Sequence, residues 1–205
     1  RGPADKVNPK DSSLDWHYYL TFPEKAPRTG FDHILVDWHP LGHPPKGIYT
    51  VPHFDFHFYV IDQKSQLGIH YKHPETPDIA DVTMPAPALI PDGYFIPPGT
   101  QVNRMGVHAV PKAAPELHGK PFTNTVIYGY SHGMLTFLEG MTSIDYLKTR
   151  PSTTQVVSTP AQYSLPGYYP RSYSLTYDAN KGVYRLMFGQ LEPWHVSQLA
   201  ADGSS

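Results

Sequence analysis

The segment from residue 52 to 61 alternates polar and aromatic residues, and a period of two predicts a β-strand. Successive side chains of a strand point to opposite faces. One face therefore carries three aromatic rings, which we expect to pack on the core: Phe54, Phe56 and Phe58. The other face carries two imidazoles and a carboxylate: His53, Asp55 and His57. Residues of these types on one face can form a metal site or an acid–base site.

Proline and glycine punctuate the whole chain, with 23 Pro and 16 Gly among 205 residues. Such dense punctuation leaves little room for long helices. The 15 Tyr and 9 Phe favour pleated, half-buried surfaces. We therefore predict a mainly β fold: a single antiparallel β-sandwich or barrel with long Pro-rich loops and at most one or two short helices.

The length suits one β-rich domain, and neither an internal repeat nor a linker divides the chain. We expect a flexible N-terminal arm over residues 1–15, a single β-rich domain over 16–198 and a flexible C-terminal tail over 199–205.

The pattern also predicts individual elements. A helix is expected over 142–148, where Thr142 offers an N-cap and Asp145 an acid three residues on. Residues 73–99 are rich in proline and are expected to form a covering loop. Strands are expected at 16–22, 34–38, 53–61, 67–71, 106–110, 122–130, 134–138, 172–177 and 183–188.

Composition argues against several classes of function. Lys and Arg total 16 against 18 Asp and Glu, without a basic run, so nucleic acid is not an expected partner. No apolar stretch reaches 18 residues, so no membrane span is expected. The chain has no Cys and hence no thiolate metal site. Low charge with many Tyr and Pro favours an extracytoplasmic protein, periplasmic or secreted, in its mature form. No motif names a small-molecule ligand.

Strand geometry limits which of the 12 histidines can share a metal ion. Positions i and i+2 on a strand lie about 6.6–7 Å apart, within reach of one ion, whereas i and i+4 lie about 13 Å apart. His53 and His57 are therefore not expected to bind the same ion. The workable pairs are His53 with Asp55, or Asp55 with His57, and a neighbouring strand must complete the site.

The best additional donors are His108 and Glu139, because both lie in apolar, strand-like surroundings where such groups need a partner. Gly106 and Gly140 beside them would let another backbone or a ligand approach closely. His43 could cap the site from the preceding loop. The candidate metal ligands are thus Asp55, His57, His108 and Glu139, with His53 second.

These ligands suit a divalent metal: zinc, copper, iron or manganese. If the site is catalytic, the metal would activate water, with Glu139 or Asp55 as general base. The polar row could equally be a solvated face or an interface between protomers. The alternatives are therefore a structural subunit of a homo-oligomeric ring, tube or filament, and a ligand-binding module that uses the aromatic loops.

Several short motifs together resemble a known family. They are Gly42-His43-Pro44-Pro45, residues 52–59, Met105-Gly106-Val107-His108, Tyr128-Gly129 and residues 137–141. The family comprises uncharacterised, mostly exported bacterial domains and is typified by a Thermus protein under extracytoplasmic sigma-factor control. The resemblance covers roughly residues 30–150. It implies a β-rich single domain that assembles into a homo-oligomer, with no established activity.

Overall fold

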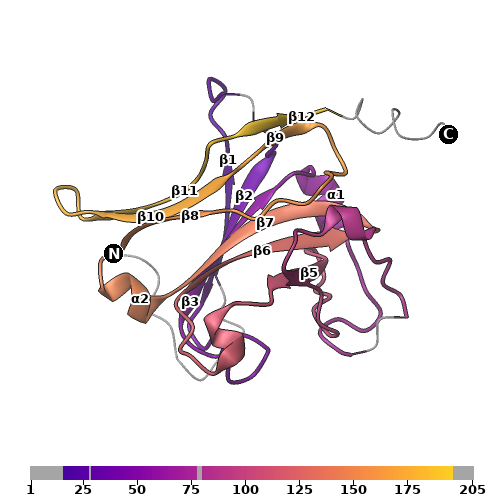
Figure 1. Ribbon diagram of the computed structural model, residues 1–205, viewed down its shortest axis with the longest axis horizontal. Coiled ribbons are helices and arrows are strands. Elements are labelled where there is room, and N and C mark those ends of the chain that lie inside the picture. Colours follow the sequence, from indigo (N-terminus) through magenta and orange to yellow (C-terminus); the bar gives the residue numbers. More distant parts are fainter. Residues whose placement is uncertain (1–15, 28, 78–79, 196–205) are drawn as a thin grey trace.

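A seven-stranded antiparallel sheet carries most of the polar residues discussed above (Figure 1). The computed structural model describes residues 16–27, 29–77 and 80–195, so the predicted arm over 1–15 and tail over 199–205 lie outside the described residues. The order of the strands is β1-β2-β3-β7-β6-β5-β4. Their bounds are β1 (Trp16–Thr21), β2 (His33–His39), β3 (His53–Tyr59), β4 (Tyr94–Phe95), β5 (Val107–Pro111), β6 (Asn124–Ser131) and β7 (Met134–Ser143).

A second layer packs on one face of this sheet. Strands β8 (Ser152–Val156), β10 (Ser172–Asp178) and β11 (Val183–Gly189) form a three-stranded sheet, and β9 (Gly167–Tyr169) pairs with β12 (Glu192–Trp194). Figure 1 shows β10 and β11 lying across β6 and β7. The core between the layers includes Tyr128 and Leu138 from the large sheet and Tyr173 and Leu175 from β10. The large sheet stays open at β1 and β4, so the predicted mainly β fold is confirmed and the barrel alternative is wrong.

The strands predicted over 172–177 and 183–188 are confirmed as β10 and β11, which pair with each other in antiparallel register. The strand predicted over 67–71 is wrong. That region begins with the helix α1 (Gln63–Leu67), because the Asp62 carboxylate accepts a hydrogen bond from the Ser65 N–H at 2.7 Å and caps it.

The second helix, α2 (Ile144–Lys148), is capped by Ser143 rather than by Thr142, which belongs to β7. Two short 3₁₀ helices lie at η3 (Pro87–Leu89) and η4 (Pro115–His118). Within the described ranges, none of the helices has the length and apolar character needed to cross a membrane.

The polar face of β3 is more completely buried than its aromatic face. His53, Asp55 and His57 are 0%, 2% and 1% exposed, whereas the three phenylalanines are half-buried. The aromatic face packs on the second layer as expected, with the ring of Phe58 5.0 Å from that of Phe188. Loops cover the other face; for example, the Tyr59 hydroxyl donates to the Arg104 carbonyl at 3.1 Å. Both faces of β3 are therefore interior.

At Gly106 and Gly140, the group that approaches closely is another part of the protein. A Cβ on Gly106 would lie 2.2 Å from the Tyr130 carbonyl oxygen, and one on Gly140 would lie 2.5 Å from the Tyr173 ring. Gly140 thus lets β10 approach β7 on the side of the sheet opposite to Glu139.

We expect Gly140→Ala to lower the free energy of unfolding by about 1–3 kcal/mol, since overpacking must displace a buried ring. Tyr173 cannot move freely because its hydroxyl donates to Asn124 Oδ1 at 2.9 Å. Urea unfolding measures the loss. The control is Gly189→Ala, whose Cβ would meet only the Ser172 hydroxyl at 3.1 Å, a group that can rotate away. Equal losses in the two variants would contradict this account of the packing.

Candidate metal centre

The register of three neighbouring strands brings the polar side chains together on the loop-covered face. Strand β3 lies between β2 and β7, antiparallel to both. Side chains directly opposite one another on the same face of such a sheet lie about 4.5–5.5 Å apart. Three cross-strand pairs result: His39 with His53, Asp37 with Asp55, and His57 with Glu139.

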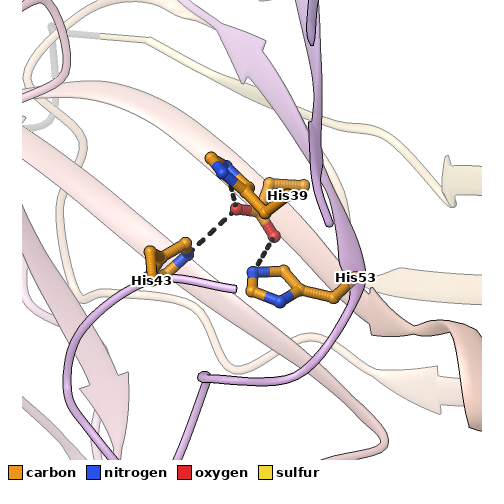
Figure 2. Close-up of side chains that lie close together, drawn as sticks. His39, His43 and His53 are labelled. Carbon is orange, nitrogen blue, oxygen red and sulfur yellow. Dashed lines mark hydrogen bonds and ion pairs between the residues drawn. The ribbon is translucent and has the colours of Figure 1, made fainter. Parts of the chain in front are cut away.

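The first cluster consists of three imidazoles around one carboxylate (Figure 2). The Nε2 atoms of His39 and His43 lie 3.2 and 3.1 Å from Asp55 Oδ2, and His53 Nε2 lies 3.4 Å from Asp55 Oδ1. One ligand atom from each residue can be chosen so that all lie within 4.8 Å of one another. In tetrahedral coordination at about 2.0–2.1 Å from an ion, ligand atoms lie about 3.3 Å apart, so these spacings suit a single metal.

A tight loop delivers His43 to this cluster. Gly42 has a φ of 69°, and a Cβ there would lie 2.1 Å from the Tyr49 carbonyl oxygen, so only glycine fits the turn. The same carbonyl accepts a hydrogen bond from the His43 N–H at 3.1 Å. The loop between β2 and β3 therefore folds back over the sheet and points the imidazole at Asp55.

Backbone carbonyls fix the orientation of two of these imidazoles. The Nδ1 atoms of His43 and His53 lie 2.6 Å from the carbonyl oxygens of Pro44 and Val51. A carbonyl only accepts, so each Nδ1 carries the hydrogen, and in the neutral ring Nε2 presents a lone pair. Both lone pairs point toward Asp55. An outer partner on Nδ1 is what metal-ligating histidines usually have.

The close packing of the first cluster shifts the pKa values of Asp55 and His43. Burial by itself would raise the pKa of Asp55, but the neighbouring imidazoles outweigh it and hold this pKa well below its usual value. Burial would likewise lower the pKa of His43, but its hydrogen bond to Asp55 raises it. Both shifts favour the ion pair between His43 Nε2 and Asp55 Oδ2.

The second cluster consists of His57, His108 and Glu139, from β3, β5 and β7. His57 Nε2 lies 3.3 Å from Glu139 Oε2. The other nitrogen of His57, Nδ1, lies 3.1 Å from Asp37 Oδ2, and His108 Nδ1 donates to the Thr100 carbonyl at 2.6 Å. Both imidazoles thus have an outer partner that directs Nε2 inward.

Burial sets the direction of the pKa shift for two residues of the second cluster, and neighbouring charges set it for the third. It raises the pKa of Glu139, because a carboxylate charge is poorly solvated there. Burial lowers the pKa of His108 to about 4, which keeps this ring neutral and able to ligate. The pKa of His57 is raised: burial opposes its charge, but the carboxylates of Glu139 and Asp37 outweigh burial.

A cavity of about 580 Å³ connects the clusters. His39, His43 and Asp55 line it from the first cluster, and His57, His108 and Glu139 line it from the second, whereas His53 is not among its lining residues. A volume of this size suits a small molecule. The apolar part of the wall includes Leu35, Val110, Leu117, Ile127, Met141 and five prolines.

The structure divides the residues predicted from sequence between the two clusters. His53 and Asp55 lie in the first, and His57, His108 and Glu139 in the second, so Asp55 is not grouped with the other three leading candidates. His43 joins the first cluster. Sequence reasoning missed His39 and the outer partner Asp37, although β2 alternates His33, Leu35, Asp37 and His39 on one face and so carried a signal.

Comparisons with known proteins identify no relative: no family model matches the chain, and neither the curated proteins nor the solved structures yield a match. The case for function therefore depends on the geometry of the site.

We expect Asp55→Asn to destabilise the metal-free protein by about 3–5 kcal/mol, because it removes the charge that pairs with buried imidazoles. Urea unfolding in the presence of a chelator measures this loss. Asp145→Asn is the matched control, since the Asp145 side chain is 89% exposed and its ion pair with Lys148 lies on the surface. A loss no larger than that of the control would show that Asp55 is not paired as described.

Proposed function

We propose that this protein is a metal-binding β-domain and that its first cluster holds a divalent ion, most suitably zinc. The observation that carries the proposal is the convergence of three Nε2 atoms on one buried carboxylate at 3.1–3.4 Å. Three nitrogens and one oxygen form a complete tetrahedral ligand set, which zinc accepts without a geometric preference of its own. Imidazole also suits copper and iron, whereas manganese favours oxygen-rich sites.

Unmatched polar atoms support an ion over a network of hydrogen bonds. His53 Nε2 and Asp55 Oδ1 are both buried, and neither makes a hydrogen bond within the described part of the chain, although they lie 3.4 Å apart. Buried polar atoms without partners are rare in native proteins. Because His43 and His53 already donate through Nδ1, both would have to become imidazolium to donate to Asp55. One divalent ion would engage the lone pairs of both.

We expect zinc in the wild-type protein, either as purified without a His tag or after zinc is added to the metal-free protein. His53→Ala and Asp55→Ala should each lower the zinc content by about one equivalent per chain. Mass spectrometry of the elements measures the content. At a free zinc concentration about 100 times Kd, the first site should add about 2.7 kcal/mol to the free energy of unfolding.

His70→Ala is the matched control, because His70 is exposed and belongs to neither cluster. It should leave the zinc content unchanged. Wild-type protein that takes up no metal when it is offered back would contradict the proposal.

A second role, self-association, is supported by the edge of the large sheet. Strand β1 ends the sheet, and its Trp16, Tyr18 and Leu20 are 36%, 39% and 49% exposed on the face opposite to the cavity. An exposed apolar edge strand is a template for pairing with another chain. We therefore propose a homo-oligomer built through β1, in accord with the family resemblance, and an extracytoplasmic location in accord with the low charge.

We expect Leu20→Lys to lower the molecular mass of the assembly, since a charged lysine on an edge strand opposes pairing. Size-exclusion chromatography with light scattering measures the mass. Leu67→Lys is the control, because Leu67 is 41% exposed but belongs to α1 and not to the edge strand. A wild-type monomer, or an oligomer that both variants leave intact, would overturn assembly through β1.

A further inference from the structure

We propose that His57, His108 and Glu139 hold a second metal ion, whose open coordination position faces the cavity and binds the carboxylate of a mostly apolar small molecule. This centre is separate from the first, since the two share no ligand. It adds a ligand-binding function to a protein that the first cluster alone would only stabilise.

The imidazoles of the second cluster are oriented as a metal site requires. His108 Nδ1 donates a hydrogen bond to the Thr100 carbonyl at 2.6 Å, and His57 Nδ1 lies 3.1 Å from Asp37 Oδ2 as an ion pair, so each imidazole has an outer partner that leaves Nε2 for the metal. The charge of Asp37 is itself paired, because His17 Nδ1 contacts its other oxygen. Asp37 therefore orients His57 without adding an uncompensated charge to the cavity.

Glu139 points to a missing partner. Its side chain is 2% exposed, and Oε2 makes no hydrogen bond with any described group, although His57 Nε2 lies 3.3 Å away. Leaving a buried carboxylate oxygen unsatisfied is costly. An ion between Glu139 and the two imidazoles would satisfy it, and ligand atoms of the three residues lie within 4.8 Å of one another, as one ion requires.

The number of donors distinguishes this centre from the first. The first cluster offers four ligands and completes a tetrahedron, whereas the second offers two nitrogens and one carboxylate. Three protein ligands with a fourth position free for water or a substrate are the arrangement of catalytic and ligand-binding zinc sites. All three residues line the cavity of about 580 Å³, so the fourth position opens into that space.

The chemistry of the cavity selects the ligand. Two neutral imidazoles and one carboxylate leave a divalent ion with a net positive charge, which an anionic oxygen donor would neutralise. The surrounding wall is largely apolar, with Leu35, Val110 and Ile127 among its residues, and would bury a hydrocarbon body. The charged side chains Glu75 and Arg104 also line the cavity but are themselves exposed. A carboxylate on an apolar body fits both the ion and the wall, and hydroxide from water is its competitor.

Cobalt substitution tests the proposal, because the visible absorption of Co²⁺ reports its coordination. Metal-free protein is reconstituted with Co²⁺, the bound metal is counted, and benzoate is added, with neutral benzamide as the matched control. We expect two equivalents in wild type and one in each of Glu139→Gln and His53→Ala. Benzoate should change the spectrum of wild type and His53→Ala but not that of Glu139→Gln, and benzamide should change none.

The outcomes separate this inference from the proposed function. One equivalent that is lost in His53→Ala and kept in Glu139→Gln would overturn the second centre alone. One equivalent lost only in Glu139→Gln would support it and overturn the first. Two equivalents with a spectrum that changes with pH but not with benzoate would assign the open position to water and overturn the carboxylate ligand. His108→Asn, checked for folding by circular dichroism, repeats the test should Glu139→Gln fail to fold.

Discussion

A carboxylate buried on the face of a sheet is the constraint on which the rest of this structure depends. Asp55 is 2% exposed, and an unpaired charge in such a place is prohibitively unfavourable. Its neighbours are accordingly arranged around it: His39 from β2, His53 from β3, and His43 from a loop that must turn sharply at Gly42. The turn at Gly42 therefore contributes to the pairing of the buried charge, because it brings His43 to Asp55.

The two faces of the large sheet have different roles. One face packs on β10 and β11 through aromatic and aliphatic side chains and supplies most of the apolar burial. On the other face an apolar side chain packs against the imidazoles of the second cluster. The ring of Phe137 lies 4.8 Å from that of His57 and 5.3 Å from that of His108, and it occupies the space that Gly129 leaves by having no side chain. Phe137 therefore packs against both imidazoles of the second cluster.

The distribution of ligands gives the two clusters different capacities. Asp55 and His57 are two residues apart on β3, so their Cα atoms lie about 6.6–7 Å apart along the strand. The first has four donors, which complete a ligand set although three of them line the cavity, and the second has three donors that all line it. A closed site that stabilises the fold next to an open site that binds a ligand is the arrangement we propose for this molecule.

Alternation in the sequence determined that residues 53–59 form a strand and that His53, Asp55 and His57 share one of its faces. It also determined that His53 and His57, four positions apart and so about 13 Å from each other, do not bind the same ion. All three conclusions depend only on the geometry of a strand. Tertiary structure alone decided which partners these side chains meet. His39 reaches His53 because the loop over residues 40–52 sets the register of β2 on β3, and register depends on long-range pairing. Burial of the polar face was likewise decided by loops far away in sequence, such as the one that places Thr100 behind His108. Local propensity also failed over residues 67–71, where a strand was expected but the region begins with a helix that Asp62 caps. A periodic pattern assigns side chains to a face, but only packing determines what covers that face.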